Sequence, residues 1–291
     1  MPMPPRETSR PRTAILVLGC RQPVYQRCIQ TIRATWGATA SAHTDIFYVY
    51  GAKRSTGEAL IDLAQLLAMH TAEPPRHALA DGDLWVSGDM ILCGAADVLS
   101  DQRDCILRKR LLAFGYLANE RGYDFVYNVC ASSYVDVAAL ERYVDGVPRS
   151  GVYHGAVVVH GASGFPFVSG ASFLLSRDVA AELAKSAEHI LATHPESMPD
   201  DVVIGHFIAS KYGGASLADI ARRIATAAPA TANQTFVVPD GGGSMDFVAK
   251  PEFRQIPEPP NFHFHFHSGR MWEMENFHRR FFAADPSDGT A

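Results

Sequence analysis

The sequence predicts an α/β protein whose central sheet is mixed but mostly parallel and is flanked by helices. Short runs of β-branched and aliphatic residues alternate with amphipathic stretches at close spacing through the first half of the chain. This alternation is typical of a parallel sheet covered by helices on both faces. The chain has 291 residues, of which 47% are apolar, so it supplies a sizeable core. The length fits one large α/β domain.

The first half is expected to alternate strand and helix. Residues 13–18 are aliphatic and end at Gly19, which indicates a buried strand. Further strands are expected at 45–50, 84–86 and 124–129, and helices at 25–35, 58–68, 105–121 and 137–144. Ligands of such sheets bind beyond the carboxyl ends of the strands. We therefore expect the functional loops at 20–25, 51–57 and 130–134.

The second half has a different pattern. Strands are expected at 152–159 and 173–175, with the Gly-containing segment 161–170 as a loop between them. Helices are expected at 178–192 and 200–212, followed by a loop-rich stretch at 228–243 and a last alternating strand near the C-terminus. Residues 1–12 and 283–291 are expected to be tails around a single domain at 13–282.

Composition excludes several classes of protein. Lys and Arg number 26 and Asp and Glu 31, so the net charge is 26 − 31 = −5 and no nucleic-acid partner is expected. No apolar run is long enough to cross a bilayer. Five cysteines without CxxC or CxxH spacing make a structural zinc site unexpected and favour a reducing compartment. We expect a soluble cytoplasmic protein of microbial or viral origin.

Two adjacent carboxylates, Asp200 and Asp201, open a predicted helix. Adjacent helix positions do not share a face, so the two acids are expected to do different things. One carboxylate suits the helix N-terminus as a cap, and the other can project into a cleft and take a proton from a hydroxyl. Two capping acids with no chemical role are the alternative.

A second motif alternates Phe and His over residues 262–267. Period-two alternation places His263, His265 and His267 on one strand face and the phenylalanines on the other. Same-face neighbours on a strand are about 7 Å apart, which is wide for three ligands of one ion. We therefore favour a Phe face in the core and a His face lining a polar groove, with one histidine used functionally.

Five short motifs follow one another in a fixed order. They are Arg27–Gly37 ("R…IR.TW"), Leu107–Tyr116 with Lys109 ("L.LKT"), Phe165–Ser176 ("YP.Y.SG.GYVLS"), Met198–Gly205 ("PDD..G") and Phe266–Ser268 ("FHS"). In this order they resemble glycosyltransferase family 31, the inverting β-1,3-glycosyltransferases that include the fringe-type and core-1 galactosyltransferases. The resemblance covers roughly residues 13–267.

The resemblance implies a GT-A fold with a nucleotide-sugar-binding half at 13–135 and an acceptor-binding, catalytic half at 136–282. It implies a UDP-sugar donor, a glycan, glycolipid or protein acceptor, and inversion. Asp201 would be the catalytic base, with Asp200 beside it. The implied donor-binding residues are Gly19, Cys20, Arg21, Arg33, Lys109, Cys130, Ala131, Ser132 and His267. The implied acceptor-binding residues are Phe167, Ser169, Gly170 and Ala171.

The chain departs from the family at its acidic DxD triplet. Tyr134 and Val135 match the residues after that triplet, but Cys130, Ala131 and Ser132 stand where the acids belong. A neutral Ser132 is a weak ligand for a hard divalent ion. A metal would otherwise neutralise the diphosphate leaving group, which is a large electrostatic contribution to catalysis.

Three interpretations therefore stay open. The enzyme needs no metal and Arg33, Lys109, Arg270 or protonated His267 stabilises the diphosphate. Alternatively, Mn²⁺ or Mg²⁺ binds weakly through His267 and His265 and the donor phosphates. In the third, the chain is a catalytically inactive relative that binds a sugar nucleotide, a glycan or a partner. A His-dependent metallohydrolase is less favoured, because no Asp accompanies the HxH pairs in a ligand pattern.

Overall fold

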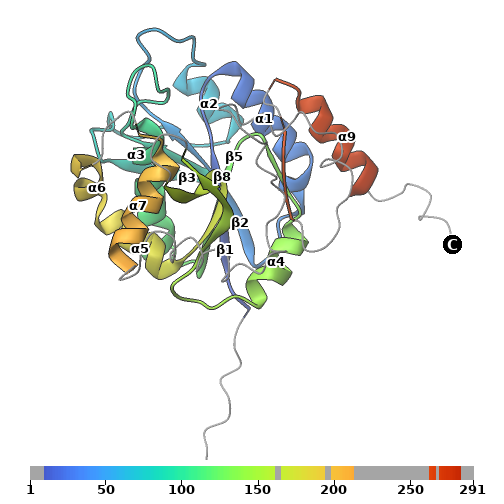
Figure 1. Cartoon of the computed structure of the whole chain (residues 1–291). Helices are drawn as coiled ribbons and strands as arrows, with labels where there is room; N and C mark the ends of the chain where they lie inside the picture. Colours follow the sequence, from blue (N-terminus) through green and yellow to red (C-terminus); the bar gives the residue numbers. More distant parts are fainter. Residues whose placement is uncertain (1–9, 161–164, 194–197, 213–261, 267–268, 283–291) are drawn as a thin grey trace, which may run out of the picture.

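The computed structural model describes residues 10–160, 165–193, 198–212, 262–266 and 269–282. A seven-stranded sheet in the order β3-β4-β2-β1-β5-β8-β7 lies between two layers of helices (Figure 1). The strands are β1 (Thr13–Leu18), β2 (Thr44–Gly51), β3 (Leu84–Ser87), β4 (Met90–Cys93), β5 (Phe125–Cys130), β6 (Ser133–Val135), β7 (Tyr153–Val159), β8 (Pro166–Ser176) and β9 (His263–His265).

The α-helices are α1 (Pro23–Ala34), α2 (Leu63–Met69), α3 (Cys105–Gly115), α4 (Val137–Asp145), α5 (Arg177–Lys185), α6 (Ala187–Thr193), α7 (Asp200–Tyr212) and α9 (Met271–Phe281). No helix in these described ranges is both long and apolar enough to cross a lipid bilayer.

The predicted class, an α/β protein with a mostly parallel sheet flanked by helices, is confirmed. β1 pairs in parallel with β2 on one side and β5 on the other, and β2 pairs in parallel with β4. β3 and β8 run antiparallel to their neighbours, so the sheet is mixed. In register, Leu18 lies opposite Val49 on one side and Cys130 on the other. The carboxyl ends of β1, β2 and β5 therefore meet at one edge.

The prediction of a loop at 161–170 is wrong for residues 166–170. Residues 166–170 belong to β8, an eleven-residue strand that pairs with both β5 and β7. The glycines, serines and proline of 161–170 are typical of a loop. Pairing with β7 supplies backbone hydrogen bonds to this stretch, so a strand forms although the local sequence does not predict one.

Several other boundaries differ from expectation. β4 was not predicted, because only four apolar residues follow the tight turn after β3. The helix expected at 58–68 begins at Leu63, where Asp62 caps it by accepting a hydrogen bond from the Gln65 N–H at 2.7 Å. The helix expected at 105–121 changes to a π-helical turn at Tyr116–Glu120. The helix expected at 178–192 is two helices divided at Ser186.

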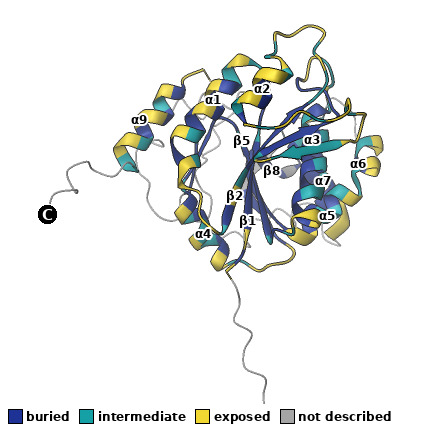
Figure 2. Ribbon diagram, turned by 180° about the vertical axis from the view of Figure 1, so that it is seen from behind, coloured by how far each residue is buried: buried dark blue, intermediate teal, exposed yellow. Residues whose placement is uncertain are grey.

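Two cores fill the spaces on either side of the sheet, and buried residues line both faces in Figure 2. β1 shows the alternation that creates them. Ile15 and Val17 face the core beneath α1, α2, α4 and α9, whereas Ala14 and Leu16 face the core beneath α3, α5, α6 and α7. The strand is thus apolar on both faces, as expected for a central parallel strand.

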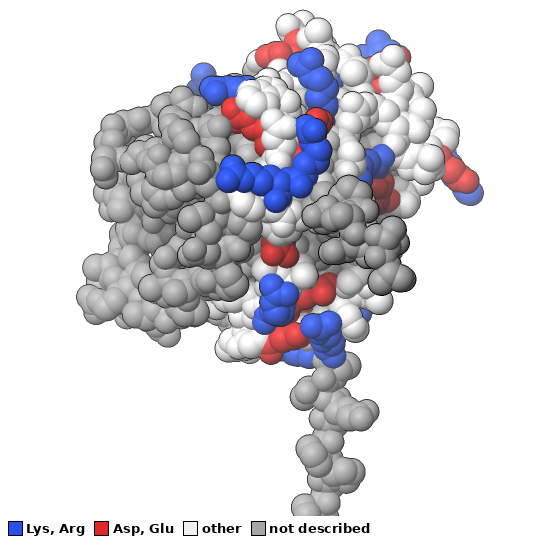
Figure 3. All heavy atoms as spheres, turned by 90° about the vertical axis from the view of Figure 1, so that its right-hand side faces the viewer, with Lys and Arg blue, Asp and Glu red and all other residues white. Residues whose placement is uncertain are grey.

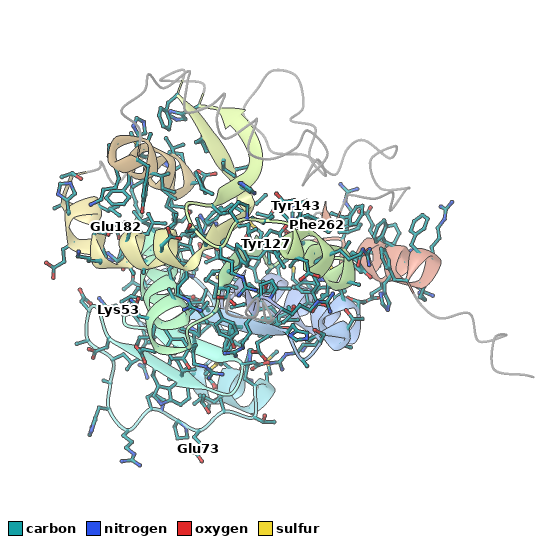
Figure 4. All side chains as sticks on the ribbon, turned by 90° about the horizontal axis from the view of Figure 1, so that it is seen from below. Lys53, Glu73, Tyr127, Tyr143, Glu182 and Phe262 are labelled. Atoms are coloured by element: carbon teal, nitrogen blue, oxygen red, sulfur yellow. The ribbon has the colours of Figure 1, made fainter. Side chains whose placement is uncertain are left out.

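The C-terminal His–Phe motif returns to the first half of the chain. β9 pairs antiparallel with β6, so that Ser133 faces His265 and Val135 faces His263 in register. Phe262 precedes β9 and packs between Tyr127 of β5 and Tyr143 of α4, with ring centroids 5.6 and 5.2 Å away (Figure 4). Burial of Phe262, Phe264 and Phe266 explains why this short two-stranded pairing is stable.

Candidate active site

The candidate site lies where the carboxyl ends of β1 and β5 meet β8. Gly19 follows Leu18, the register partner of Cys130. The Cys130 Sγ lies 3.6 Å from the carbonyl oxygen of Gly170 on β8. Gly19 and Cys130, two of the predicted donor-binding residues, therefore lie at the same edge of the sheet as Gly170, a predicted acceptor-binding residue.

Asp201 reaches this edge from the first turn of α7. Its Oδ2 accepts a hydrogen bond from the Gly170 N–H at 2.7 Å, and its Oδ1 accepts one from the Val202 N–H at 2.9 Å. The side chain is nearly buried, at 8% exposure. A Cβ on residue 170 would lie 2.9 Å from the Asp201 Oδ2. Only glycine at this position lets the carboxylate approach the strand so closely.

Asp200 is neutralised by Arg110. The Arg110 guanidinium is buried, forms an ion pair with the Asp200 carboxylate and donates a hydrogen bond to the Gly170 carbonyl at 2.9 Å. The two adjacent acids therefore have different partners, a guanidinium for Asp200 and backbone N–H groups for Asp201. Burial lowers the pKa of Arg110, and the negative charge of the nearby Asp201 carboxylate opposes that shift.

A second buried cluster lies at the ends of β1 and β2. Lys109 Nζ donates to the Gly19 carbonyl, the Asp97 carbonyl and the Asp97 carboxylate, each at 3.1 Å. Asp97 also accepts hydrogen bonds from the backbone N–H groups of Arg21 and Gly51. Lys109, Asp97 and Arg21 are all buried. Two cations and one carboxylate leave this cluster with one net positive charge.

Sequence reasoning missed Arg110 and Asp97. The available signal was two consecutive basic residues, Lys109 and Arg110, in a predicted helix. The other buried residues of that helix are apolar. Asp97 lies in the loop after β4. Because that strand was not predicted, nothing in the sequence indicated that Asp97 lies at the sheet edge.

Cys130, Ala131 and Ser132, which stand at the place of the acidic triplet in the predicted resemblance, supply no carboxylate for a metal ion. Burial raises the pKa of the Cys130 thiol, so this group stays protonated. Ser132 Oγ lies 3.2 Å from His265 Nε2. Among the described residues, no three His, Cys, Asp or Glu side chains are grouped so that they could hold a metal ion. His267 lies outside the described residues.

The two described histidines of the motif are held by serines. His263 is fully buried between the hydroxyl groups of Ser133, at 2.8 Å, and Ser172, at 3.2 Å. Burial holds its pKa well below the ordinary value, so the ring is neutral. His265 is partly exposed and faces Ser132. Of the histidine face that was expected to line a polar groove, His263 is completely buried, whereas His265 is partly exposed.

Arg33 lies apart from this edge. It is in the last turn of α1, forms an ion pair with Asp89 at 2.6 Å and contacts His70 Nδ1 at 2.7 Å. Asp89 directly precedes β4, so the Arg33 charge is balanced near the start of that strand. Arg270, another expected cation, is about half exposed and lies 3.6 Å from Glu273.

The expected acceptor-binding residues are mostly buried in packing. Phe167 packs with Val202 of α7, and a Cβ on Gly205 would meet Phe167 at 2.9 Å. Ser169 Oγ accepts a hydrogen bond from the Ala171 N–H at 3.3 Å, and both residues are buried. Gly170 is the member of this group that contacts Asp201.

No protein-family model matches the chain, and no curated protein sequence matches it. Among solved structures, it is similar to the apo form of the glycosyltransferase GlyE from Streptococcus pneumoniae TIGR4, with 11% identity and a TM-score of 0.36. That alignment covers 68% of this chain and 43% of the GlyE chain, so the chain spans less than half of its length. Membership of glycosyltransferase family 31 stays a prediction.

Proposed function

We propose that the protein is an inverting glycosyltransferase that moves a hexose or N-acetylhexosamine from a UDP-sugar to an acceptor hydroxyl in a β-1,3 linkage. The observation that carries the proposal is that Asp200 and Asp201 have different partners. Arg110 compensates Asp200, whereas the Asp201 carboxylate at the same sheet edge is bonded to backbone N–H groups. Among the described residues Asp201 forms no ion pair, and the carboxylate that is not ion-paired is the better proton acceptor of the two.

In the proposed step, the Asp201 carboxylate takes the proton of the acceptor hydroxyl. The acceptor oxygen attacks C1 of the donor sugar as the bond from C1 to the diphosphate oxygen breaks, and UDP leaves with the bonding pair. Attack on the face opposite the diphosphate inverts the anomeric centre. The fixed Gly170 backbone supports this role because it orients the carboxylate before substrate arrives.

Negative charge accumulates on the diphosphate as it leaves. The cluster of Arg21, Lys109 and Asp97 carries one net positive charge at the end of β1. The helix α1 begins at Pro23, directly after this loop, and has no acidic residue in its first turn. A helix N-terminus with a neighbouring cation favours an anion. We therefore propose that the diphosphate binds at residues 19–23.

We further propose that turnover requires no divalent ion. This proposal rests on the protonated thiol of Cys130 and the histidine-bound hydroxyl of Ser132, which replace two acids in the family's metal motif. The positive cluster around Lys109 and the N-terminus of α1 would supply the stabilisation instead.

A second candidate is a catalytically inactive sugar-nucleotide-binding protein. The observation that favours it is the near burial of Asp201, whose two oxygens both accept backbone hydrogen bonds. Such a carboxylate also suits a purely structural cap. The two candidates differ in turnover and not in donor binding.

The test is hydrolysis and transfer assayed with UDP-glucose, UDP-galactose, UDP-GlcNAc and UDP-GalNAc, with EDTA or with Mn²⁺. We expect turnover of at least one donor that survives EDTA. Asp201→Asn should lower kcat by about 100- to 10,000-fold, because a general base acts mainly in the transition state. The thermal shift produced by UDP should change little.

Asp178→Asn is the matched control. Asp178 also opens a helix and accepts a hydrogen bond from a glycine N–H, that of Gly151 at 2.9 Å, but on α5. Full activity of Asp201→Asn would show that the base is assigned wrongly. UDP-dependent stabilisation without turnover of any donor would favour the inactive binding protein, and no response to UDP would reject both candidates.

A further inference from the structure

A surface groove of about 510 Å³ lies where helices α1 and α9 meet. This volume is within the range of small-molecule sites, about 300–1,000 Å³. Its wall on α1 is one stripe, because Arg27, Thr31 and Ala34 recur at i, i+4 and i+7. Trp272 and Glu275 form the wall on α9, three residues apart.

The groove is built on fixed elements. The Thr31 hydroxyl donates a hydrogen bond across the groove to Glu275 at 3.3 Å. The inner faces of both helices, including Ile29 of α1 and Met274 of α9, are buried in the same core. Side chains mounted on packed helices hold their positions better than side chains on loops, so the groove exists before a ligand binds.

Trp272 gives the groove a large apolar surface. Its side chain is 59% exposed, whereas Trp36 is completely buried. An indole ring presents a flat apolar face with an electron-rich π system and one N–H donor at its edge. Pyranose rings pack their C–H bonds against such a face.

The polar side chains of the groove complement hydroxyl groups. Among the described residues, Arg27 and Gln30 have no hydrogen-bond or ion-pair partner although both line the groove. A guanidinium donates, a carboxylate accepts and an amide does both. Arg27 and Glu275 carry opposite charges, so the groove favours a neutral ligand. Figure 3, which views this side of the molecule, shows basic and acidic side chains intermixed.

We propose that this groove is a saccharide-binding site, with one sugar ring stacked on Trp272 and its hydroxyls bonded to Arg27, Gln30 and Glu275. A phosphate would meet the Glu275 carboxylate, and an apolar peptide would bury the unpaired side chains of Arg27 and Gln30. A neutral polyhydroxylated ring avoids both costs. The site is separate from Asp201 and does not depend on the proposed transfer reaction.

The test is saturation-transfer difference NMR of the full chain with four oligosaccharides, namely cellotriose, maltotriose, triacetylchitotriose and lactose. We expect at least one to bind the wild-type protein. Trp272→Ala should weaken that binding by at least about tenfold, because stacking is lost, and Arg27→Ala and Glu275→Gln should weaken it less. These side chains lie at the surface, and thermal unfolding verifies that each variant is folded.

Tyr212→Ala is the matched control, because Tyr212 is another exposed aromatic residue, at 45%, on a different helix. It should bind the sugar as the wild type does, and saturating UDP should not displace the sugar. Binding of none of the four sugars overturns the proposal. So does binding that survives Trp272→Ala, binding that is lost in Asp201→Asn, or a Trp272-dependent dimer in sedimentation velocity.

Discussion

Asn128 has a polar amide side chain that is buried among apolar side chains. It is completely buried in β5, and within the described part of the chain neither amide atom has a hydrogen-bond partner. Its register partners are Leu16 on β1 and Phe173 on β8, which both belong to the core beneath α3. A buried polar group without a partner costs about 1–3 kcal/mol.

Asn128→Leu should therefore raise the free energy of unfolding by about 1 kcal/mol, because leucine has a similar shape and no unsatisfied atoms. Urea unfolding at pH 7.5 measures the change. Asn128→Asp should destabilise the protein instead, since it buries a charge in the same place. A loss of stability in Asn128→Leu would mean that the amide has a partner in solution.

Gly170 shows what the antiparallel strand β8 contributes at the level of elements. Its N–H faces Asp201 of α7 and its carbonyl oxygen faces Arg110 of α3, so one strand residue connects two helices. The Cys130 thiol at the end of β5 approaches the same carbonyl. The relative positions of α3, α7 and β5 are thus coupled through the backbone of a single residue.

Gly170→Ala should reduce both stability and transfer activity. The new methyl group would lie 2.9 Å from Asp201 Oδ2 and 3.0 Å from its Cβ, so α7 or the strand must shift. We expect a loss of about 1–3 kcal/mol in unfolding free energy, as for other overpacked sites. Activity should fall at least about tenfold, because a small misplacement of a catalytic group is costly.

Gly57→Ala provides the comparison for that variant. No atom lies within 4 Å of a Cβ built at Gly57. Its unfolding free energy should stay within about 0.5 kcal/mol of the wild type. Equal behaviour of the two alanine variants in chemical unfolding would show that the contact between Gly170 and Asp201 is not tight.

Neutral buried histidines determine how the whole molecule responds to acid. Burial lowers the pKa of His70 and His154 and holds that of His263 well below its ordinary value. Each ring therefore binds its proton at a lower pH in the folded protein than in the unfolded chain, where histidine protonates near pH 6.5. The unfolded state therefore binds more protons, so stability rises with pH across this window.

Unfolding free energy should fall as the pH is lowered from 7 to 5. Each histidine that stays neutral contributes up to about 1.4 kcal/mol per pH unit below 6.5. Urea midpoints at pH 7, 6 and 5 measure the slope, and His154→Gln should make it shallower. A pH-independent midpoint would show that the three rings protonate in the folded state.

The sequence by itself determined the α/β class and the succession of most strands and helices along the chain. Apolar runs such as Thr13–Leu18 and the acidic first turn of Asp200–Tyr212 are local signals, and local signals predict elements. The stretch 166–170 was wrongly predicted as a loop, because its strand pairing comes from residues distant in the sequence.

Only the tertiary structure decided which polar residues share the site. Asp97 and Arg110 belong to the site because they form hydrogen bonds with residues distant in the sequence. Arg33 lies outside the site, where it forms an ion pair with Asp89. The physical reason is that a buried charge takes the partner that the packed helices bring to it. The spacing of two residues in the sequence gives their separation along the chain. It does not show whether they lie close together at the sheet edge.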